Sequence, residues 1–272
     1  MHDTAHTHGQ HFFALYWQPH FKNVVELGSQ NINGSLRDHA PASASYLGLD
    51  TAPGAGVDRV VVPGATLPLP DGCADVVVTS SALEHDPCFW ETFLEMVRLL
   101  RPGGLLYINA PSNHAFHRHP VDCWRFYPDA GTALVAWAHR RGAEVELVES
   151  FVAKPAAQGW SDFVAIFRRP GPPLLRRGRL ADLGETQNSF DIEAVGLQHE
   201  RPDTFDMRAL ANARQQLQAC ERERDELRVR ADRTGSELRK AYEAILALKQ
   251  ESEALRQQLL SVQPASGRTG TR

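Results

Sequence analysis

Residues 206–262 place apolar side chains in a heptad register that never slips, and this repeat constrains the fold more than any other feature. With position a at Leu210 and position d at Ala213, thirteen of the sixteen a and d positions up to Val262 are apolar. Such a repeat predicts a coiled coil. A stripe this narrow needs a partner helix, so we expect a homo-oligomer, either dimer or trimer, through residues 206–262. The alternative is a long helix that folds back on its own domain.

Residues 12–168 show the pattern of an α/β domain. Short apolar strands that alternate with helices predict βαβ units around a mostly parallel sheet. The last two predicted strands are joined by a loop without a helical pattern, so they could pair antiparallel at one end. Strands are expected at 23–27, 45–49, 59–62, 75–79, 105–110, 144–151 and 161–168, and helices at 87–100 and 129–141.

The remaining segments are predicted to carry little structure. Residues 1–11 hold four histidines among small polar residues and are expected to form a disordered tail, with metal binding as the minor alternative. Residues 12–17 are expected to form a lid helix over the site. The Pro- and Arg-rich residues 169–205 are expected to be a linker, and residues 263–272 a second disordered tail.

Charge and composition exclude several classes of protein. The net charge of −4 gives no electrostatic case for nucleic acid. No apolar run approaches the ~18 residues of a membrane span, and the N-terminus lacks the features of a secretory signal. The four cysteines show no metal-ligand spacing, so we expect no metal site and a cytoplasmic location. The arginines from Arg168 to Arg179 could contact the inner face of a membrane, meet an acidic glycan, or belong to a solvated linker.

A glycine turn follows the first predicted strand. Glu26 lies near the end of that strand, Gly28 begins the turn, and Gly34 comes before the next element. Asp50 ends the second strand 22 residues after Gly28, a spacing that suits a carboxylate bound to ribose hydroxyls. The turn is not GxGxxG and no second nucleotide-binding half follows, so these residues do not indicate a dinucleotide.

Three further blocks are LPLPDG at 67–72, LEH at 83–85 and LLRPGG at 99–104. With the glycine turn, they resemble class I S-adenosylmethionine-dependent methyltransferases of type 11 over residues 22–168. The resemblance implies a Rossmann-like sheet of seven strands, the last antiparallel, and S-adenosylmethionine as cofactor. The cofactor-binding residues that it implies are Glu26, Gly28, Ser29, Gln30, Gly34, Asp50, Gly64, Ala65 and Ser81.

Two positions depart from that family. Gln30 stands where a glycine is frequent, and Pro63 stands where an acidic residue often binds the adenine amine. We therefore expect weakened binding of the cofactor rather than none.

The segments GSQNINGSLR (28–37) and HAFHRHPVDCWRFYP (114–128) resemble a bacterial subgroup associated with surface glycan synthesis. A sugar hydroxyl needs a base near neutral pH, which favours histidine. We expect His117 as the base, His85 as the second candidate and Asp122 as the orienting partner. A structural role stays open for each, and Asp122 could instead pair with Arg118 or Arg125. The predicted substrate-binding residues, for which structural roles also stay open, are His114, Trp124 and Arg125.

These features predict a methyltransferase that modifies a sugar hydroxyl of a bacterial surface polysaccharide or its precursor, with room for a partner protein in glycan assembly. One alternative is a catalytically silent scaffold that oligomerises through its coiled coil. Another is the same chemistry on a lipid or small metabolite.

Overall fold

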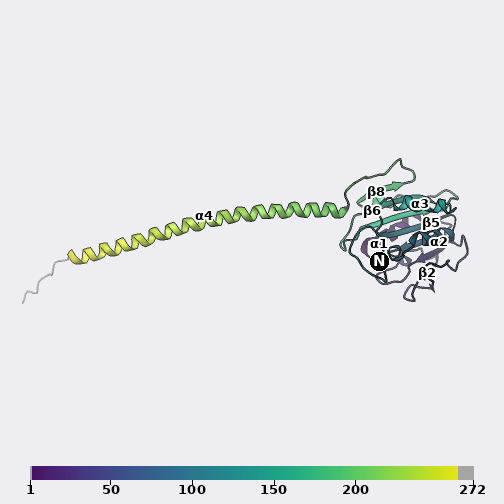
Figure 1. Cartoon of the computed structure of the whole chain (residues 1–272), viewed down its shortest axis with the longest axis horizontal. Helices are drawn as coiled ribbons and strands as arrows, with labels where there is room; N and C mark the ends of the chain where they lie inside the picture. Colours follow the sequence, from purple (N-terminus) through teal and green to yellow (C-terminus); the bar gives the residue numbers. More distant parts are fainter. Residues whose placement is uncertain (1, 263–272) are drawn as a thin grey trace, which may run out of the picture. The chain divides into compact units, whose positions relative to one another are not determined.

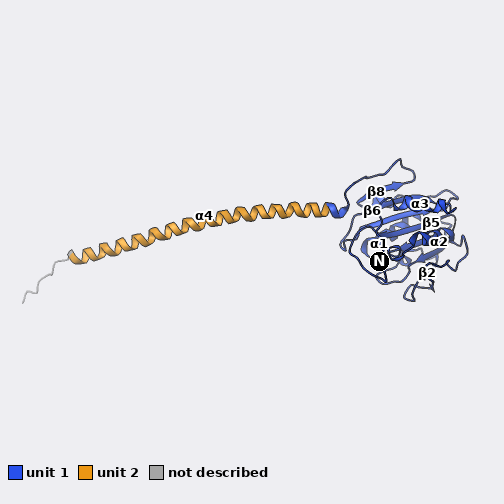
Figure 2. Ribbon diagram, in the orientation of Figure 1, with its two compact units in different colours: residues 1–207 blue, residues 208–272 orange. Residues whose placement is uncertain are grey.

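The computed structural model describes residues 2–262 (Figure 1). The chain divides into two compact units, residues 1–207 and residues 208–272 (Figure 2). The predicted tail at 263–272 lies outside the described residues.

The first unit is built on one sheet in the order β3-β2-β1-β4-β5-β7-β6-β8. Strands β1 to β5 pair in parallel, whereas β7 runs antiparallel to both β5 and β6. The predicted Rossmann-like sheet with an antiparallel strand near one edge is thus present, but β8 adds an eighth strand to the predicted seven. The bounds are β1 (Asn23–Leu27), β2 (Ser45–Asp50), β3 (Arg59–Val60), β4 (Ala74–Ser80), β5 (Leu100–Pro111), β6 (Glu146–Ala153), β7 (Asp162–Arg168) and β8 (Thr186–Asp191).

Helices cover both faces of this sheet (Figure 1). Because side chains alternate along a strand, Val77 of β4 joins a core with α2 and α3, while Val76 and Val78 join a second core with α1. The two helices predicted at 87–100 and 129–141 are confirmed with slightly shorter bounds. The helical elements are α1 (Asp3–Tyr16), α2 (Phe89–Leu99), α3 (Ala130–Arg140), η1 (Leu36–His39), η2 (Leu83–His85) and η3 (Leu180–Leu183).

Residues 3–16 form helix α1, so the prediction of a disordered tail at 1–11 is wrong over the described part of that segment. His2 is bonded to the fully buried carboxylate of Asp162 at 2.5 Å. Gly9 abuts the Leu36 side chain, where a Cβ would lie 2.2 Å from Leu36 Cδ2. The lid predicted at 12–17 is wrong for a related reason, since Phe12 and Tyr16 are buried in the core beneath the sheet.

The predicted linker at 169–205 contains both η3 and the edge strand β8. The strand turns Gln187, Ser189 and Asp191 inward, so the side that it buries is polar. Arg176 forms a bidentate ion pair with the Asp191 carboxylate and thereby neutralises the buried negative charge. A strand that buries polar rather than apolar side chains has no hydrophobic alternation to reveal it.

The arginines between 168 and 179 bond within the same unit. Arg169 donates to the Leu100 carbonyl, Arg176 binds Asp191, and Arg179 binds Asp182. Arg168 donates to the carbonyl of Gly171, and the Arg177 backbone N–H donates to Leu15. Of these arginines, Arg176 and Arg179 are paired with carboxylates, and a membrane contact through Arg168–Arg179 stays a prediction.

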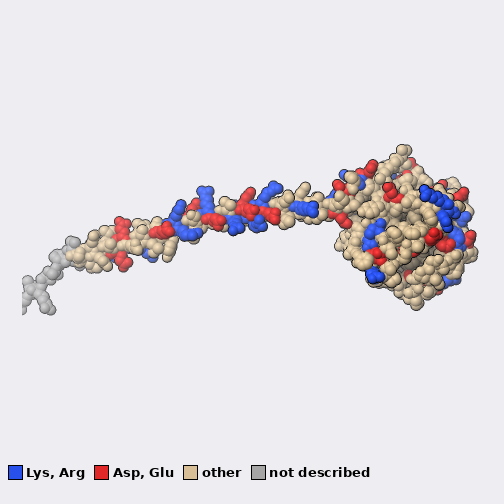
Figure 3. All heavy atoms as spheres, in the orientation of Figure 1, with Lys and Arg blue, Asp and Glu red and all other residues tan. Residues whose placement is uncertain are grey.

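A single helix, α4 (Phe205–Val262), carries the heptad repeat. Its 58 residues correspond to about 87 Å at 1.5 Å per residue. Seam residues such as Leu217, Leu238 and Leu248 are exposed by 60%, 71% and 64%. Basic and acidic side chains alternate along the helix (Figure 3). Among the described residues, no helix combines the length and the apolar character needed to cross a membrane.

The packing of α1 predicts the effect of truncating its inner face. Phe12→Ala should lower the free energy of unfolding by about 3–5 kcal/mol, because Phe12 is 1% exposed and packs against Tyr107. The exposed Gln10 serves as the control, and Gln10→Ala should stay within about 0.5 kcal/mol. Urea denaturation measures both, and equal stability of the two variants would mean that α1 is not part of the core.

Candidate functional site

The parallel strands bring the turns after β1 and β4 into contact at the carboxyl edge of the sheet. Gly28 has a φ of +79°, and a Cβ there would lie 2.5 Å from the Ala82 Cβ. Only glycine permits both that conformation and that approach. Ser81 is the residue before Ala82, so two of the predicted cofactor-binding turns lie side by side.

Asp50 joins this arrangement from the end of β2. Its Oδ2 accepts the Gln30 backbone N–H at 2.9 Å, and its Oδ1 accepts the Thr51 N–H at 2.7 Å. A carboxylate has about four lone-pair positions, so half-buried Asp50 keeps capacity for further donors. The predicted residues Asp50 and Gln30 are thus in direct contact.

Buried hydroxyl groups surround the same turns. The Oγ atoms of Ser29, Ser80 and Ser81 are buried and have no hydrogen-bond partner within residues 2–262. Buried polar groups are normally satisfied, so this cluster fits a polar ligand. The residues at this edge are therefore compatible with a ribose-bearing cofactor.

Glu26 lies beneath the turn rather than at its surface. It is 2% exposed, and its Oε2 accepts a 2.8 Å hydrogen bond from the Tyr46 hydroxyl. Burial raises the pKa of Glu26 to about 7. In this position Glu26 links β1 to Tyr46 of β2.

The other predicted cofactor-binding residues lie further out. Gly34 has a φ of +112° and is covered by His6 of α1, since a Cβ on Gly34 would lie 3.0 Å from the His6 ring. Gly64 and Ala65 form an exposed turn in which the Ala65 N–H donates to the Val62 carbonyl.

The loop after β5 brings the predicted catalytic residues together. Rings of His85 and His117 lie 5.0 Å apart, edge to face. Asp122 accepts the His117 backbone N–H at 2.8 Å and lies 3.4 Å from His117 Nδ1. His85 Nδ1 bonds to the Val121 carbonyl, and burial lowers the pKa of His85. The Nε2 atoms of both rings are therefore left as acceptors.

Arg125 binds Asp122 through two bonds of 2.6 and 2.8 Å, which hold the pKa of Asp122 well below its usual range. Of the two pairings considered for Asp122, this is the one found. The predicted substrate-binding residue Trp124 donates its indole N–H to the Asp86 carbonyl and packs against Phe89.

Trp160 and Glu84 belong to this cluster although the sequence did not single them out. The ring of the predicted substrate-binding residue His114 stacks on the Trp160 ring, with 4.0 Å between the ring centroids. The ring centroids of His2 and His117 lie 5.0 and 5.3 Å from that of Trp160. Glu84 is 1% exposed, and burial raises its pKa to about 7. Its place beside His85 in the LEH block was the one signal that could have found it.

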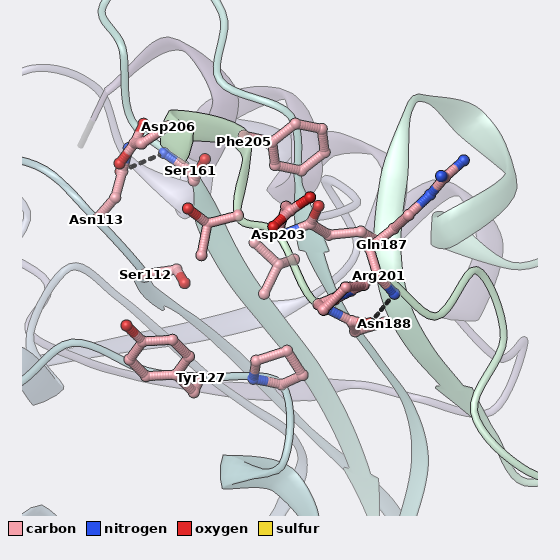
Figure 4. A pocket seen from close by; sticks show the side chains of 14 residues that line it. Ser112, Asn113, Tyr127, Ser161, Gln187, Asn188, Arg201, Asp203, Phe205 and Asp206 are labelled. Atoms are coloured by element: carbon pink, nitrogen blue, oxygen red, sulfur yellow. Dashed lines mark hydrogen bonds between the residues drawn. The ribbon is translucent and has the colours of Figure 1, made fainter. Parts of the chain in front are cut away.

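A polar cavity of about 200 Å³ opens beside this loop (Figure 4). It lies between the end of β5 and the start of β7, at the same carboxyl edge. Side chains of Ser112, Tyr127 and Gln187 line it, and the Gln187 Oε1 and Ser161 Oγ atoms have no partner among the described residues. The cavity is below the roughly 300–1,000 Å³ of drug-sized sites, so it fits a small polar group better than a whole cofactor.

Several known proteins are similar to parts of this chain. Residues 21–108 match the family model described as methyltransferase domain. An uncharacterized methyltransferase of Mycobacterium ulcerans (strain Agy99) is 33% identical over 173 residues, which cover 53% of this chain and 68% of that protein. One from Mycobacterium sp. (strain JLS) is 44% identical over 55 residues, but these cover 20% of this chain and 22% of that protein.

A solved structure, the Burkholderia thailandensis 1,6-didemethyltoxoflavin-N1-methyltransferase with bound S-adenosylhomocysteine, is 16% identical. The match covers 61% of this chain and 78% of that one, with a TM-score of 0.46, and it says nothing about the substrate of this chain. The match to the methyltransferase domain confirms the predicted cofactor, S-adenosylmethionine. Because it is 33% identical to the M. ulcerans methyltransferase and covers 68% of it, the chain belongs to the methyltransferase family.

Proposed function

We propose that this methyltransferase transfers the methyl group to an oxygen atom, namely a sugar hydroxyl of a bacterial surface polysaccharide or its precursor. The observation that carries the proposal is the pair His85 and His117, whose Nδ1 atoms face carbonyl oxygens, so that Nε2 of each neutral ring is an acceptor. This pair lies next to the predicted cofactor turn, because η2 begins directly after Ala82, which touches Gly28. An imidazole placed there suits an acceptor that must lose a proton.

The residues that would hold the cofactor are Gly28, Ser29, Asp50 and Ser81. S-adenosylmethionine supplies a methyl group that is activated by the adjoining sulfonium. Asp50 would accept hydrogen bonds from ribose hydroxyls while it fixes Gln30, and the unpartnered serine hydroxyls would bind polar atoms of the cofactor.

His117 would accept the hydroxyl proton at Nε2, and Asp122 would hold the ring in place through the His117 backbone. A positioned base of this kind contributes about 10²–10⁴-fold to the rate. The stacked rings of His114 and Trp160 offer an aromatic face for a sugar ring. Arg125 is committed to Asp122, so its part in substrate binding would be indirect.

An oligomeric role is proposed as the second function, and the exposed seam of α4 supports it. A coiled coil through residues 206–262 would bury side chains such as Leu238 and Ile245, which are otherwise exposed by 71% and 53%. A silent scaffold that oligomerises this way remains the alternative to catalysis, as does methylation of a lipid or small metabolite. A cytoplasmic location and a partner protein in glycan assembly are part of the same proposal.

Removal of the Asp50 carboxylate tests the cofactor site. Asp50→Ala should raise the Kd of S-adenosylmethionine about tenfold or more, since a charge-assisted hydrogen bond contributes about 1.5–3 kcal/mol. Asp71 is paired with Arg98 elsewhere in the unit, so Asp71→Ala is the matched control and should leave the Kd unchanged. Calorimetric titration measures both. An unchanged Kd in Asp50→Ala would move the cofactor away from β2.

A change at His117 tests the base. His117→Gln should reduce kcat by about 10²–10⁴-fold while leaving cofactor binding intact. The measurement is transfer of labelled methyl to glycan precursors, with His20→Gln as a control on a histidine outside the cluster. Full activity of His117→Gln would assign the proton transfer to another group. Cofactor binding without transfer to any acceptor would favour the scaffold.

The heptad seam gives a further test. Leu238→Glu together with Ile245→Glu puts charges at two a positions and should convert the oligomer to a monomer in light scattering of the full chain. Val229 is 69% exposed but lies off the seam, so Val229→Glu should keep the assembly. If the wild-type chain, the double variant and Val229→Glu all have the same mass, the interface does not lie along this seam.

A further inference from the structure

Three metal-ligating side chains meet at the carboxyl edge. Glu84 and His85 come from η2 and His117 from the loop after β5, and one ligand atom from each lies within 4.8 Å of the others. Glu84 Oε1 is 3.7 Å from His85 Nε2. The cluster therefore combines two imidazoles and one carboxylate, contributed by two separate segments of the chain.

Glu84 supplies an independent indication of a ligand. The residue is 1% exposed, and its Oε2 accepts no hydrogen bond from any residue in the described range 2–262. A buried carboxylate oxygen without a partner is costly and uncommon in folded proteins. A cation at the cluster would supply the missing partner.

The two rings are already oriented as metal ligands usually are. His85 directs Nδ1 at the Val121 carbonyl, and His117 directs Nδ1 at the Ala115 carbonyl, 3.3 Å away, with Asp122 at 3.4 Å. Histidines that bind metals commonly donate their second ring N–H to a carbonyl or carboxylate in this way. Each ring therefore keeps an Nε2 lone pair for an ion.

We propose that Glu84, His85 and His117 bind a divalent first-row transition metal ion such as Zn²⁺. Two imidazoles and a carboxylate are a common donor set for these ions, and they leave coordination positions open. Ligands at about 2.1 Å from one tetrahedral ion lie about 3.4 Å apart, so the ligand atoms, which now lie within 4.8 Å of one another, close by up to about 1.4 Å on binding. His119, whose ring lies 6.3 and 6.0 Å from those of His85 and His117, is a further imidazole close to the cluster.

The use of the ion in catalysis rests on the proposed function, whereas its binding does not. A hydroxyl bound to a divalent metal ion is a stronger acid than the same hydroxyl in water, which suits methylation at oxygen. At Nε2 of His117 a metal ion and a proton are alternatives, so with the ion bound His117 would not act as the base and the hydroxyl proton would pass to solvent. Metal binding needs neither cofactor nor acceptor, so it is measured apart from turnover.

The test is titration of the full-length, chelator-treated protein with Co²⁺, followed by visible absorption, and with Zn²⁺, followed by calorimetry. One equivalent should bind saturably without cofactor. Glu84→Gln, His85→Gln and His117→Gln should each weaken binding tenfold or more. Asp122→Asn, which removes the carboxylate beside His117 and its ion pair with Arg125 but no metal ligand, should weaken it about 10–100-fold.

His6 is the matched control, because it pairs with His39 at 3.2 Å in a separate histidine cluster. His6→Gln should leave the Co²⁺ spectrum and affinity unchanged. The proposal is overturned if the wild-type protein shows no saturable binding, or if the spectrum survives in His85→Gln and His117→Gln. Circular dichroism checks folding, and should Glu84→Gln unfold, the loop variant His117→Gln decides. Metal binding without methyl transfer would contradict the proposed function but would support the proposed metal site.

Discussion

Parallel pairing of β2, β1, β4 and β5 is the constraint on which the site depends. Parallel strands all end at one edge, so residues far apart in the sequence are delivered to the same place. Gly28, Asp50 and Ser81 follow or end three different strands and meet there without any loop having to cross the sheet. Antiparallel β7 begins at that edge, and it therefore adds Trp160 from the residues just before it.

Two buried carboxyl groups near this edge, those of Asp122 and Glu84, have pKa values shifted in opposite directions. Asp122 receives both arms of Arg125, and its pKa falls well below the usual range. Glu84, a few ångströms from His85, has no such partner, and burial raises its pKa to about 7. Neighbouring carboxyl groups with opposite shifts are typical of functional sites, where one group holds the geometry and the other has capacity to bind.

The sequence predicts elements well where burial is apolar and poorly where it is polar. The run around Val76–Val78 places β4 to within a residue at each end, because every side chain of that strand is buried. Strand β8 was not predicted from the sequence, because its inward residues include the polar Gln187 and Asp191. The first turns of helix α1 were not predicted, because they consist of histidines and small residues without an apolar pattern. The contacts of this segment with Asp162 and Leu36 are visible only in three dimensions.

The same reasoning applies to the site. The contact between Gln30 and Asp50 follows from strand ends that spacing can predict, whereas Trp160 lies in a loop with no pattern of its own. Some features depend only on three-dimensional geometry, such as the lack of a hydrogen-bond partner for Glu84 Oε2. Neither the composition nor the periodicity of the sequence can predict them. They become recognisable only when a missing hydrogen-bond partner can be seen.

The bond between His2 and Asp162 joins residues 160 positions apart and has a consequence for biosynthesis. At a translation rate of about 5–20 residues per second, the first turn of α1 leaves the ribosome roughly 8–32 s before the strand that completes its contacts. Until then, the apolar face of that helix is covered only by the strands that emerge earlier, β1, β4 and β5. The domain is thus expected to close late, when β7 emerges, and the order of synthesis leaves its first helix the longest exposed to chaperones.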